Sequence, residues 1–105
     1  MTLGVYPNSI VTNVSLFKIA QHSRNLRHLY LSEFRGITDE GIIAVANGCF
    51  FLEDLVLFNC RSVTYAGIRE LIKRCPNLVR LDIRGTAVPK DMAAVIRAHK
   101  IKVAL

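Results

Sequence analysis

The chain has 105 residues, enough for one domain, and 51% of them are hydrophobic, enough for a buried core. No apolar run approaches the roughly 20 residues of a membrane-spanning helix, and the N-terminal segment lacks the basic start and apolar stretch of a secretory signal. We therefore expect an intracellular protein of the cytoplasm or nucleus, with an organelle as the alternative, and no membrane partner.

The net charge of +6 is unevenly distributed. Residues 1–60 carry four Lys/Arg and five Asp/Glu, a net −1, whereas residues 61–105 carry ten and three, a net +7. A basic half attracts nucleic acid, anionic lipid or an acidic protein surface, or else it is an ordinary solvated surface.

The sequence aligns with itself when it is shifted by 26 residues. Three aliphatic columns show this offset: Leu26, Leu52 and Leu78; Leu29, Leu55 and Leu81; Leu31, Leu57 and Ile83. A period of about 20–50 residues is typical of a solenoid, in which each unit packs on its neighbours. We therefore predict a single domain of about four units, at 1–25, 26–51, 52–77 and 78–105.

The first unit predicts a strand over 2–6, where Leu3 and Val5 alternate with other residues. A helix over 12–23 follows, and Thr12 stands at its N-cap position. The apolar face of this helix has the spacing i, i+3, i+4 and i+7 and consists of Leu16, Ile19, Ala20 and Ser23.

The second and third units repeat this order. Strands are predicted over 28–32 and 54–58, and helices over 39–48 and 65–75, with Thr38 and Thr64 as N-caps. Gly48 and Pro76 fall where the two helices must end. The buried helix faces are Ile42, Val45, Ala46 and Cys49, and Ile68, Leu71, Ile72 and Cys75.

The last unit is shortened. A strand is predicted over 80–84 and a helix over 90–99, which opens at Pro89. The predicted apolar face of this helix is Met92, Val95, Ile96 and His99, about two residues earlier than the 26-residue offset from the preceding helix would place it. A final strand over 101–105 carries alternating apolar residues. Because neither end shows a polar cap, we expect self-association through the ends, a partner docked there or further flanking sequence; a modest cap formed by the short unit is the alternative.

These patterns resemble leucine-rich repeats, whose strand segment reads L-x-x-L-x-L-x-x-N/C. More narrowly, "GITDEGIIAVANGCFFLEDLVLFNC" and "SVTYAGIRELIKRCPNLVRLDI" resemble the cysteine-containing subfamily with 26-residue units. Its signature is a Cys, a Thr-Asp-x-Gly helix start and a Cys-Pro-x-Leu helix exit. The resemblance implies an α/β leucine-rich-repeat solenoid, a segment of a right-handed horseshoe. This subfamily is best known from the substrate-binding arms of F-box proteins.

Three positions depart from that signature, and no segment resembles an F-box. Ser23 occupies the second Cys column, and Tyr65 stands where Asp is usual. Phe34 occupies the first Cys/Asn column, which otherwise holds Asn8, Cys60 and Thr86. Phe34 can only pack in that turn, whereas Asn8 and Thr86 offer hydrogen bonds.

The cysteines are predicted to be reduced and structural. Cys60 sits in the tight turn that leaves a strand, where a small polarisable side chain fits. Cys49 and Cys75 lie near the ends of successive helices, which pack about 8–10 Å apart. That separation is too great for a disulfide, whose Cα atoms lie within about 7 Å.

No motif predicts chemistry. The sequence has no Gly-rich phosphate loop, no G-x-S-x-G, no HExxH and no paired carboxylates in a plausible cleft. A zinc site needs Cys-x-x-Cys or a Cys/His group of four, whereas His22, His28 and His99 belong to different parts of the unit. We expect no enzyme, no cofactor and no metal.

Side chains that alternate with the core leucines are predicted to point outward from a concave sheet, in three rows at 26-residue steps. The rows are Thr2–His28–Asp54–Arg80, Gly4–Tyr30–Val56–Asp82 and Tyr6–Ser32–Phe58–Arg84. The predicted partner-binding residues are His28, Tyr30, Ser32, Asp54, Val56, Phe58, Arg80, Asp82 and Arg84. Exposed aromatic residues with Arg nearby are typical of an interface hot spot; isolated exposed apolar residues are the alternative.

The outer helical surface is basic and holds Arg69, Lys73, Arg74, Lys90 and Arg97. A nucleic-acid site needs aromatic side chains among such residues for base stacking, and the sequence indicates none. Nucleic acid is therefore an unlikely partner.

These features predict a protein–protein interaction module. The family resemblance implies substrate recognition for an F-box-type ubiquitin ligase through the concave sheet. The alternatives are a scaffold or assembly factor that uses the same surface, in an organelle for instance, and a basic RNA- or lipid-binding module.

Overall fold

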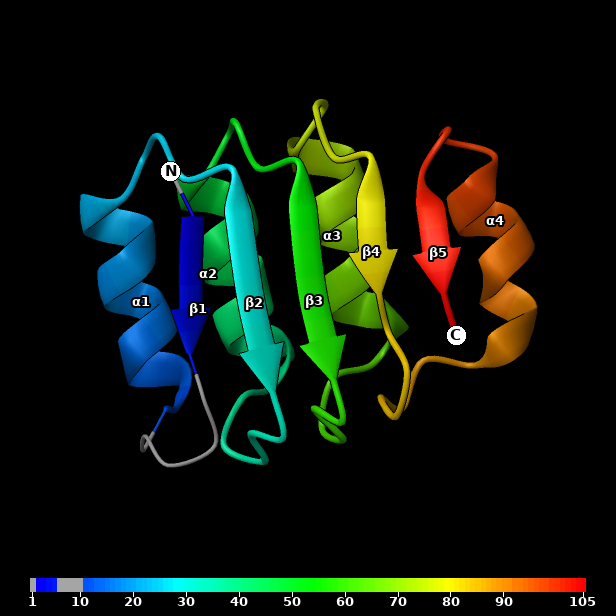
Figure 1. The fold of residues 1–105 in the computed structure, drawn as a ribbon, viewed down its shortest axis with the longest axis horizontal. Coiled ribbons are helices and arrows are strands. Elements are labelled where there is room, and N and C mark those ends of the chain that lie inside the picture. Colours follow the sequence, from blue (N-terminus) through cyan, green and yellow to red (C-terminus); the bar gives the residue numbers. More distant parts are fainter. Residues whose placement is uncertain (1, 6–10) are drawn as a thin grey trace.

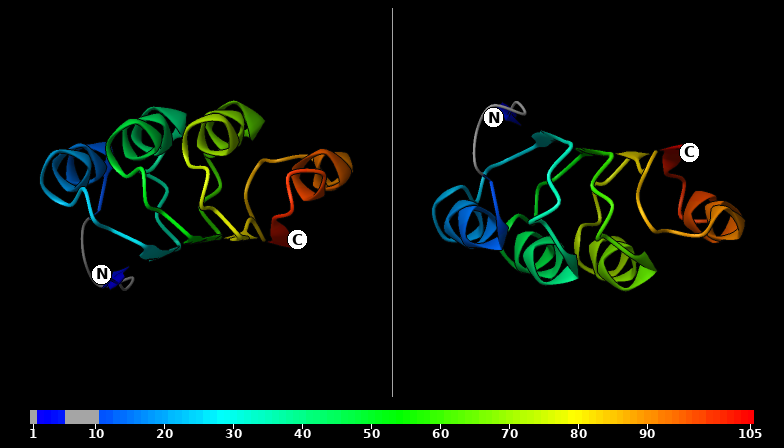
Figure 2. Two further views of the ribbon diagram at one scale, coloured as in Figure 1. Left: turned by 90° about the horizontal axis from the view of Figure 1, so that it is seen from above. Right: turned by 90° about the horizontal axis from the view of Figure 1, so that it is seen from below.

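The structure is a computed structural model that describes residues 2–5, as backbone path, and residues 11–105. Five parallel strands form one sheet in the order β1-β2-β3-β4-β5, and all the helices lie on one side of it (Figures 1 and 2). The strands are β1 Thr2–Val5, β2 His28–Ser32, β3 Asp54–Phe58, β4 Arg80–Asp82 and β5 Lys102–Ala104. The helices are α1 Asn13–His22, α2 Asp39–Gly48, α3 Tyr65–Arg74, the 3₁₀ turn η1 Lys90–Met92 and α4 Ala93–Arg97.

The strand register keeps the 26-residue offset of the sequence. Thr2 pairs with His28, His28 with Asp54, and Asp54 with Arg80. The last step is 22 residues, from Arg80 to Lys102, because the final unit is shorter. The predicted solenoid of alternating strands and helices is confirmed.

Alternation in the strands and the 3.6-residue period in the helices build a common core. The inward leucines of β2, β3 and β4 are fully buried, as are the facing helix residues Ile42, Val45, Ile68 and Leu71. In α1 only Leu16 of the predicted face is buried. Within the described residues, no helix is both long and apolar enough to cross a bilayer.

The last helix differs from its prediction. Residues 90–99 form a 3₁₀ turn and then a short α-helix. The buried side chains there are Ala93 and Ile96, with Met92 partly buried, whereas Val95 is 43% exposed and His99 is exposed. A 3₁₀ turn has about three residues per turn, so it rotates the following residues away from the predicted phase.

Other predicted boundaries differ by a few residues. The predicted strand over 80–84 ends at Asp82, and the predicted strand over 101–105 is limited to Lys102–Ala104. Tyr6 and Asn8, assigned above to the first strand and first turn, lie outside the described residues.

The starts of the first three helices are linked, each to the next, by a side chain. Thr12, Thr38 and Thr64 occupy the predicted N-cap positions; Thr12 and Thr64 cap their own helices with the side-chain oxygen, whereas the Thr38 side chain does not. Asn13 accepts a hydrogen bond from the Thr38 backbone N–H at 2.9 Å and donates to the Thr38 hydroxyl at 2.7 Å. Asp39 accepts from the Thr64 N–H at 2.8 Å and from its hydroxyl. Asn13 and Asp39, the residues after the first two caps, therefore each satisfy the cap of the next unit.

Two glycines are required by close approach or by backbone conformation. A Cβ on Gly48 would lie 2.4 Å from the carbonyl oxygen of Ala20, so the chain can approach Ala20 this closely only because Gly48 has no side chain. Gly85 has φ +75° in the turn after β4, and the matching residues Glu33 and Asn59 also have positive φ. A left-handed residue thus recurs after each of these three strands.

The three cysteines are buried free thiols. The Cys75 thiol donates to the carbonyls of Cys49 at 3.6 Å and Ala46 at 3.8 Å, and the Cys49 thiol donates to the Ser23 carbonyl at 3.7 Å. Burial raises the pKa of all three thiols, and that of Cys75 to about 11. All three are neutral packing residues, and Cys49 and Cys75 also satisfy helix-end carbonyls of the preceding unit.

Replacing Asp39 by Ala should destabilise the fold by about 1–2 kcal/mol, because the Thr64 N–H and hydroxyl lose their acceptor. Urea unfolding measures the change. The neighbouring exposed Glu40→Ala variant is the control and should change stability by less than about 0.5 kcal/mol. Equal losses in the two variants would contradict the proposed link between units.

Stability should fall between about pH 9 and pH 11. The Cys75 thiol has its pKa raised from 9.0 to about 11 in the folded protein, so its contribution is complete below the unfolded-state value and is lost as pH rises through the folded one. Urea unfolding at pH 8, 9, 10 and 11 measures the fall, which should be smaller in Cys75→Ala. If the two proteins lose stability in parallel, the Cys75 thiol is not the cause.

Candidate functional site

The predicted binding residues form one surface on the side of the sheet opposite the helices. We call this surface the sheet face; it comprises His28, Tyr30, Ser32, Asp54, Val56, Phe58, Arg80, Asp82 and Arg84. Register places His28 beside Asp54 and Asp54 beside Arg80, and it also aligns Tyr30, Val56 and Asp82. Ser32 pairs with Phe58. Arg84 lies just beyond β4, with its guanidinium carbon 5.0 Å from the centre of the Phe58 ring.

Two sheet-face residues are not exposed as predicted. Asp54 and Asp82 are only 6% and 7% exposed, whereas Tyr30 is 36% exposed and Val56 and Phe58 are half-buried. The long side chains beside them on the same face cover the two short carboxylates. Outward direction on a strand therefore does not guarantee exposure.

Asp54 lies under a group of longer polar side chains. The Tyr30 hydroxyl donates to its Oδ2 at 3.2 Å, and Arg80 Nη1 and His28 Nδ1 lie 3.7 and 3.8 Å from the same oxygen. Among the side chains that the structure describes, Asp54 Oδ1 and His28 Nδ1 have no hydrogen-bond partner. Burial first, and then the charge and hydrogen bond of Asp54, raise the pKa of the Tyr30 phenol, which therefore stays a hydrogen-bond donor at neutral pH.

Asp82 holds Arg84 in place. Arg84 Nε donates to the Asp82 carboxylate oxygens at 3.0 and 3.2 Å, and Nη2 donates at 2.7 Å. Burial alone would raise the pKa of Asp82, but the hydrogen bonds and charge of Arg84 outweigh it and lower that pKa. A guanidinium has five N–H donors, so both hydrogens of Nη1 and one of Nη2 remain for a partner, directly above Phe58.

The sheet face presents mainly positive charge to solvent. The side chains of Arg80 and Arg84 are 64% and 54% exposed, whereas those of Asp54 and Asp82 are 8% and 10% exposed. The buried carboxylates thus position the arginines and offer little surface of their own. This arrangement suits recognition of carboxylates beside an apolar anchor.

A leucine-rich repeat family model matches residues 22–46, which span the end of α1, all of β2 and most of α2. This sequence match supports the same repeat architecture as the parallel sheet and the constant strand register. The chain is a leucine-rich-repeat solenoid. Among the residues that the structure describes, no group of three His, Cys, Asp or Glu side chains is placed to bind a metal ion.

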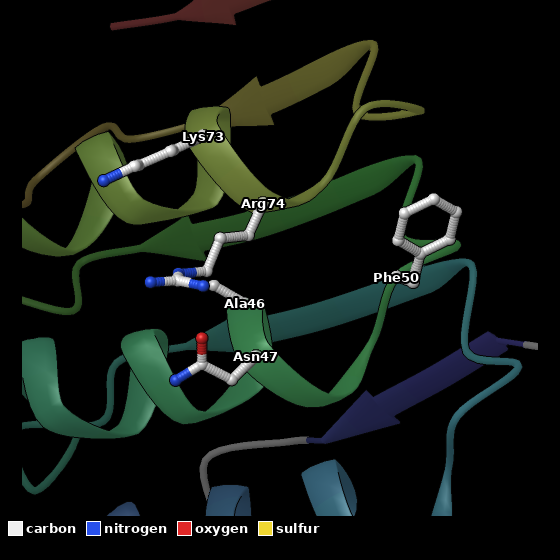
Figure 3. A pocket seen from close by; sticks show the side chains of 5 residues that line it. All are labelled: Ala46, Asn47, Phe50, Lys73 and Arg74. Atoms are coloured by element: carbon white, nitrogen blue, oxygen red, sulfur yellow. The ribbon is translucent and has the colours of Figure 1, made fainter.

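Described residues line two surface hollows that the sequence did not indicate. One, of about 200 Å³, is lined by Glu33, Arg35, Asn59 and Arg61 after β2 and β3. The other, of about 340 Å³, is lined by Ala46, Asn47, Phe50, Lys73 and Arg74 at the ends of α2 and α3 (Figure 3).

The second hollow corrects one prediction. Phe50 lines the same hollow as the basic residues Lys73 and Arg74, on the side away from their charged groups (Figure 3), whereas the sequence indicated no aromatic side chain there. Helical periodicity assigns residues to a helix face and omits the loop that follows, so Phe50 was missed. Comparison of the loop columns between units would have found it.

Replacing Asp54 by Asn should lower the pKa of the Tyr30 phenol toward its ordinary value of 10.0, because a negative charge beside the phenol is removed. NMR titration of ¹³C-labelled tyrosine measures this change. Asp91→Asn, at an exposed position in η1, is the control and should leave the Tyr30 titration unchanged. An unchanged titration in Asp54→Asn would show that Asp54 does not perturb Tyr30.

Proposed function

We propose that the sheet face recognises another protein. The observation that carries this proposal is Arg84, which Asp82 holds over the half-buried ring of Phe58 while part of its guanidinium edge remains available. Aromatic residues and arginine are enriched at interface hot spots. Ordering Arg84 before binding reduces the side-chain entropy that association would otherwise cost.

The sheet face offers two kinds of contact side by side. Tyr30, Val56 and Phe58 provide apolar and aromatic area for an anchoring side chain. Arg80 and Arg84 flank that area and suit a carboxylate of the partner. The role is recognition and not catalysis, in keeping with the general use of leucine-rich repeats as interaction modules.

For the cellular setting, we propose substrate recognition for an F-box-type ubiquitin ligase. The support is the resemblance to the cysteine-containing subfamily, namely the buried Cys49, Cys60 and Cys75 and the Thr38-Asp39 helix start. A scaffold or assembly factor, organellar for instance, is the second candidate and uses the same surface. Deleting the gene separates the two, because a ligase substrate should accumulate whereas a scaffolded partner should keep its level.

Self-association through the end strands is a further element of this proposal, because β1 and β5 each have one neighbour in the sheet. Light scattering over a concentration series tests it. Nucleic-acid binding remains a minor alternative, and its steep loss of affinity with added salt would reveal it.

Phe58→Ala should weaken binding through the sheet face by about 2 kcal/mol, roughly 30-fold. Binders would be selected from a displayed library of random 12-residue peptides, and their affinities measured by calorimetry. Arg84→Lys should also weaken binding, because Lys keeps the charge but lacks the planar fork.

Phe17→Ala is the control, because Phe17 is 41% exposed on α1, away from the sheet. It should leave affinity unchanged, and thermal unfolding of each variant should show that the fold is retained. Selected peptides whose affinity is unaffected by Phe58→Ala and by Tyr30→Ala would place the recognition surface elsewhere and overturn the proposal.

A further inference from the structure

The loop from α2 to β3 contains two adjacent phenylalanines that the repeat does not require. Phe50 and Phe51 occupy the columns that hold Arg24-Asn25 in the preceding unit and Pro76-Asn77 in the following one. Only the next column, Leu52 in this unit, is a core position, with 0% exposure. Neither turn formation nor core packing therefore explains two aromatic residues here.

Phe50 is the most exposed aromatic side chain in residues 11–105, at 55%, and Phe51 is 39% exposed. The two rings meet edge to face, with centroids 5.3 Å apart and planes at 89°. Arg27 lies over Phe51, 5.7 Å from the ring centre, and pairs with Glu53 at 2.6 Å. Phe51 and Arg27 thus support Phe50 from the side and leave its outer face open.

Phe50 forms one wall of the second hollow, which we call the helix-end hollow and define by Ala46, Asn47, Phe50, Lys73 and Arg74 (Figure 3). Its volume of about 340 Å³ lies at the small end of the range for ligand sites, about 300–1,000 Å³. The Asn47 side chain also lines the hollow, and its amide can both donate and accept hydrogen bonds.

The hollow is positively charged. Lys73 has no ion pair with any described carboxylate, and Arg74 uses only Nε, which donates to Glu70 at 3.1 Å. The remaining guanidinium donors of Arg74 and the Lys73 ammonium group have no acidic side chain on α2 to neutralise them, since the only acidic residues of α2, Asp39 and Glu40, lie in its first turn.

We propose that the helix-end hollow is a second docking site, separate from the sheet face, for a short acidic peptide segment of a protein. A carboxylate of the segment contacts Lys73 and Arg74. A neighbouring apolar side chain packs on Phe50. The Asn47 amide, on the same side of the hollow as the Arg74 guanidinium (Figure 3), hydrogen-bonds the peptide backbone.

The geometry favours a peptide over single-stranded nucleic acid. Sequence-independent binding of a single strand stacks successive bases on aromatic faces along a basic groove. The Phe50 and Phe51 rings are at 89° to one another and do not present parallel faces to successive bases. The lining of the hollow holds two cations, Lys73 and Arg74, which are too few to follow a phosphate backbone.

The test is an ¹⁵N–¹H NMR titration of the whole chain with a capped pentapeptide, acetyl-Gly-Asp-Leu-Glu-Gly-amide, up to about 5 mM, where a Kd of 1 mM is readily measured. Saturable shifts are expected at the amides of Asn47, Phe50, Lys73 and Arg74. The same peptide with Lys in place of Asp and Glu should bind at least tenfold more weakly.

Phe50→Ser and Lys73→Gln should each weaken the acidic peptide about tenfold, and because both residues are exposed the variants should stay folded. Phe17→Ser and Lys18→Gln, exposed on α1, are the matched controls and should leave the affinity unchanged. The variants act on this hollow alone, so their outcome is independent of the sheet face.

Three results would overturn the inference: no saturable shift at the hollow, equal binding of the acidic and lysine peptides, or shifts at the hollow from oligothymidylate that exceed those from the peptide. The third would assign the hollow to single-stranded nucleic acid. Shifts confined to the sheet face would support the proposed function while removing this second site.

Discussion

Parallel pairing of strands at a constant offset of 26 residues is the constraint on which the rest of this structure depends. It stacks the leucines of one unit on those of the next, so that β2, β3 and β4 share one core with the helices behind them. The same offset aligns the outward side chains in rows, and that is how His28 comes to lie beside Asp54. Core and binding surface are therefore two consequences of one register.

Hydrogen bonds at the helix starts show how the offset is maintained and where it ends. Asn13 and Asp39 each bind the N-cap threonine of the following unit. Tyr65, at the next position, has no equivalent partner, because the last unit opens at Pro89, whose nitrogen has no hydrogen to donate. The departure at Tyr65 thus accompanies the shorter final step of the sheet.

The residues that depart from the repeat pattern also supply the exposed aromatic and cationic groups of the surface. The repeat columns explain the leucines, the threonine caps and the buried cysteines, and these residues explain stability. Phe58, Arg84 and Phe50 are not explained by the columns, since other units place different residues there. The first two lie on the sheet face and the third at the helix ends, so the solenoid presents aromatic and cationic groups on two of its sides.

The sequence by itself determined the strands, the first three helices, their N-caps and the inward leucines, because each of these follows from local periodicity and capping chemistry. Only the tertiary structure decided the burial of Asp54 and Asp82, the position of Arg84 over Phe58 and the hollow that Phe50 shares with Lys73. Apart from the local pair of Asp82 and Arg84, these features depend on how far side chains from residues about 26 apart reach toward one another. The length, rotamer and charge of the neighbouring side chains determine which of these contacts form. The hydrophobic periodicity of a single chain segment does not predict them.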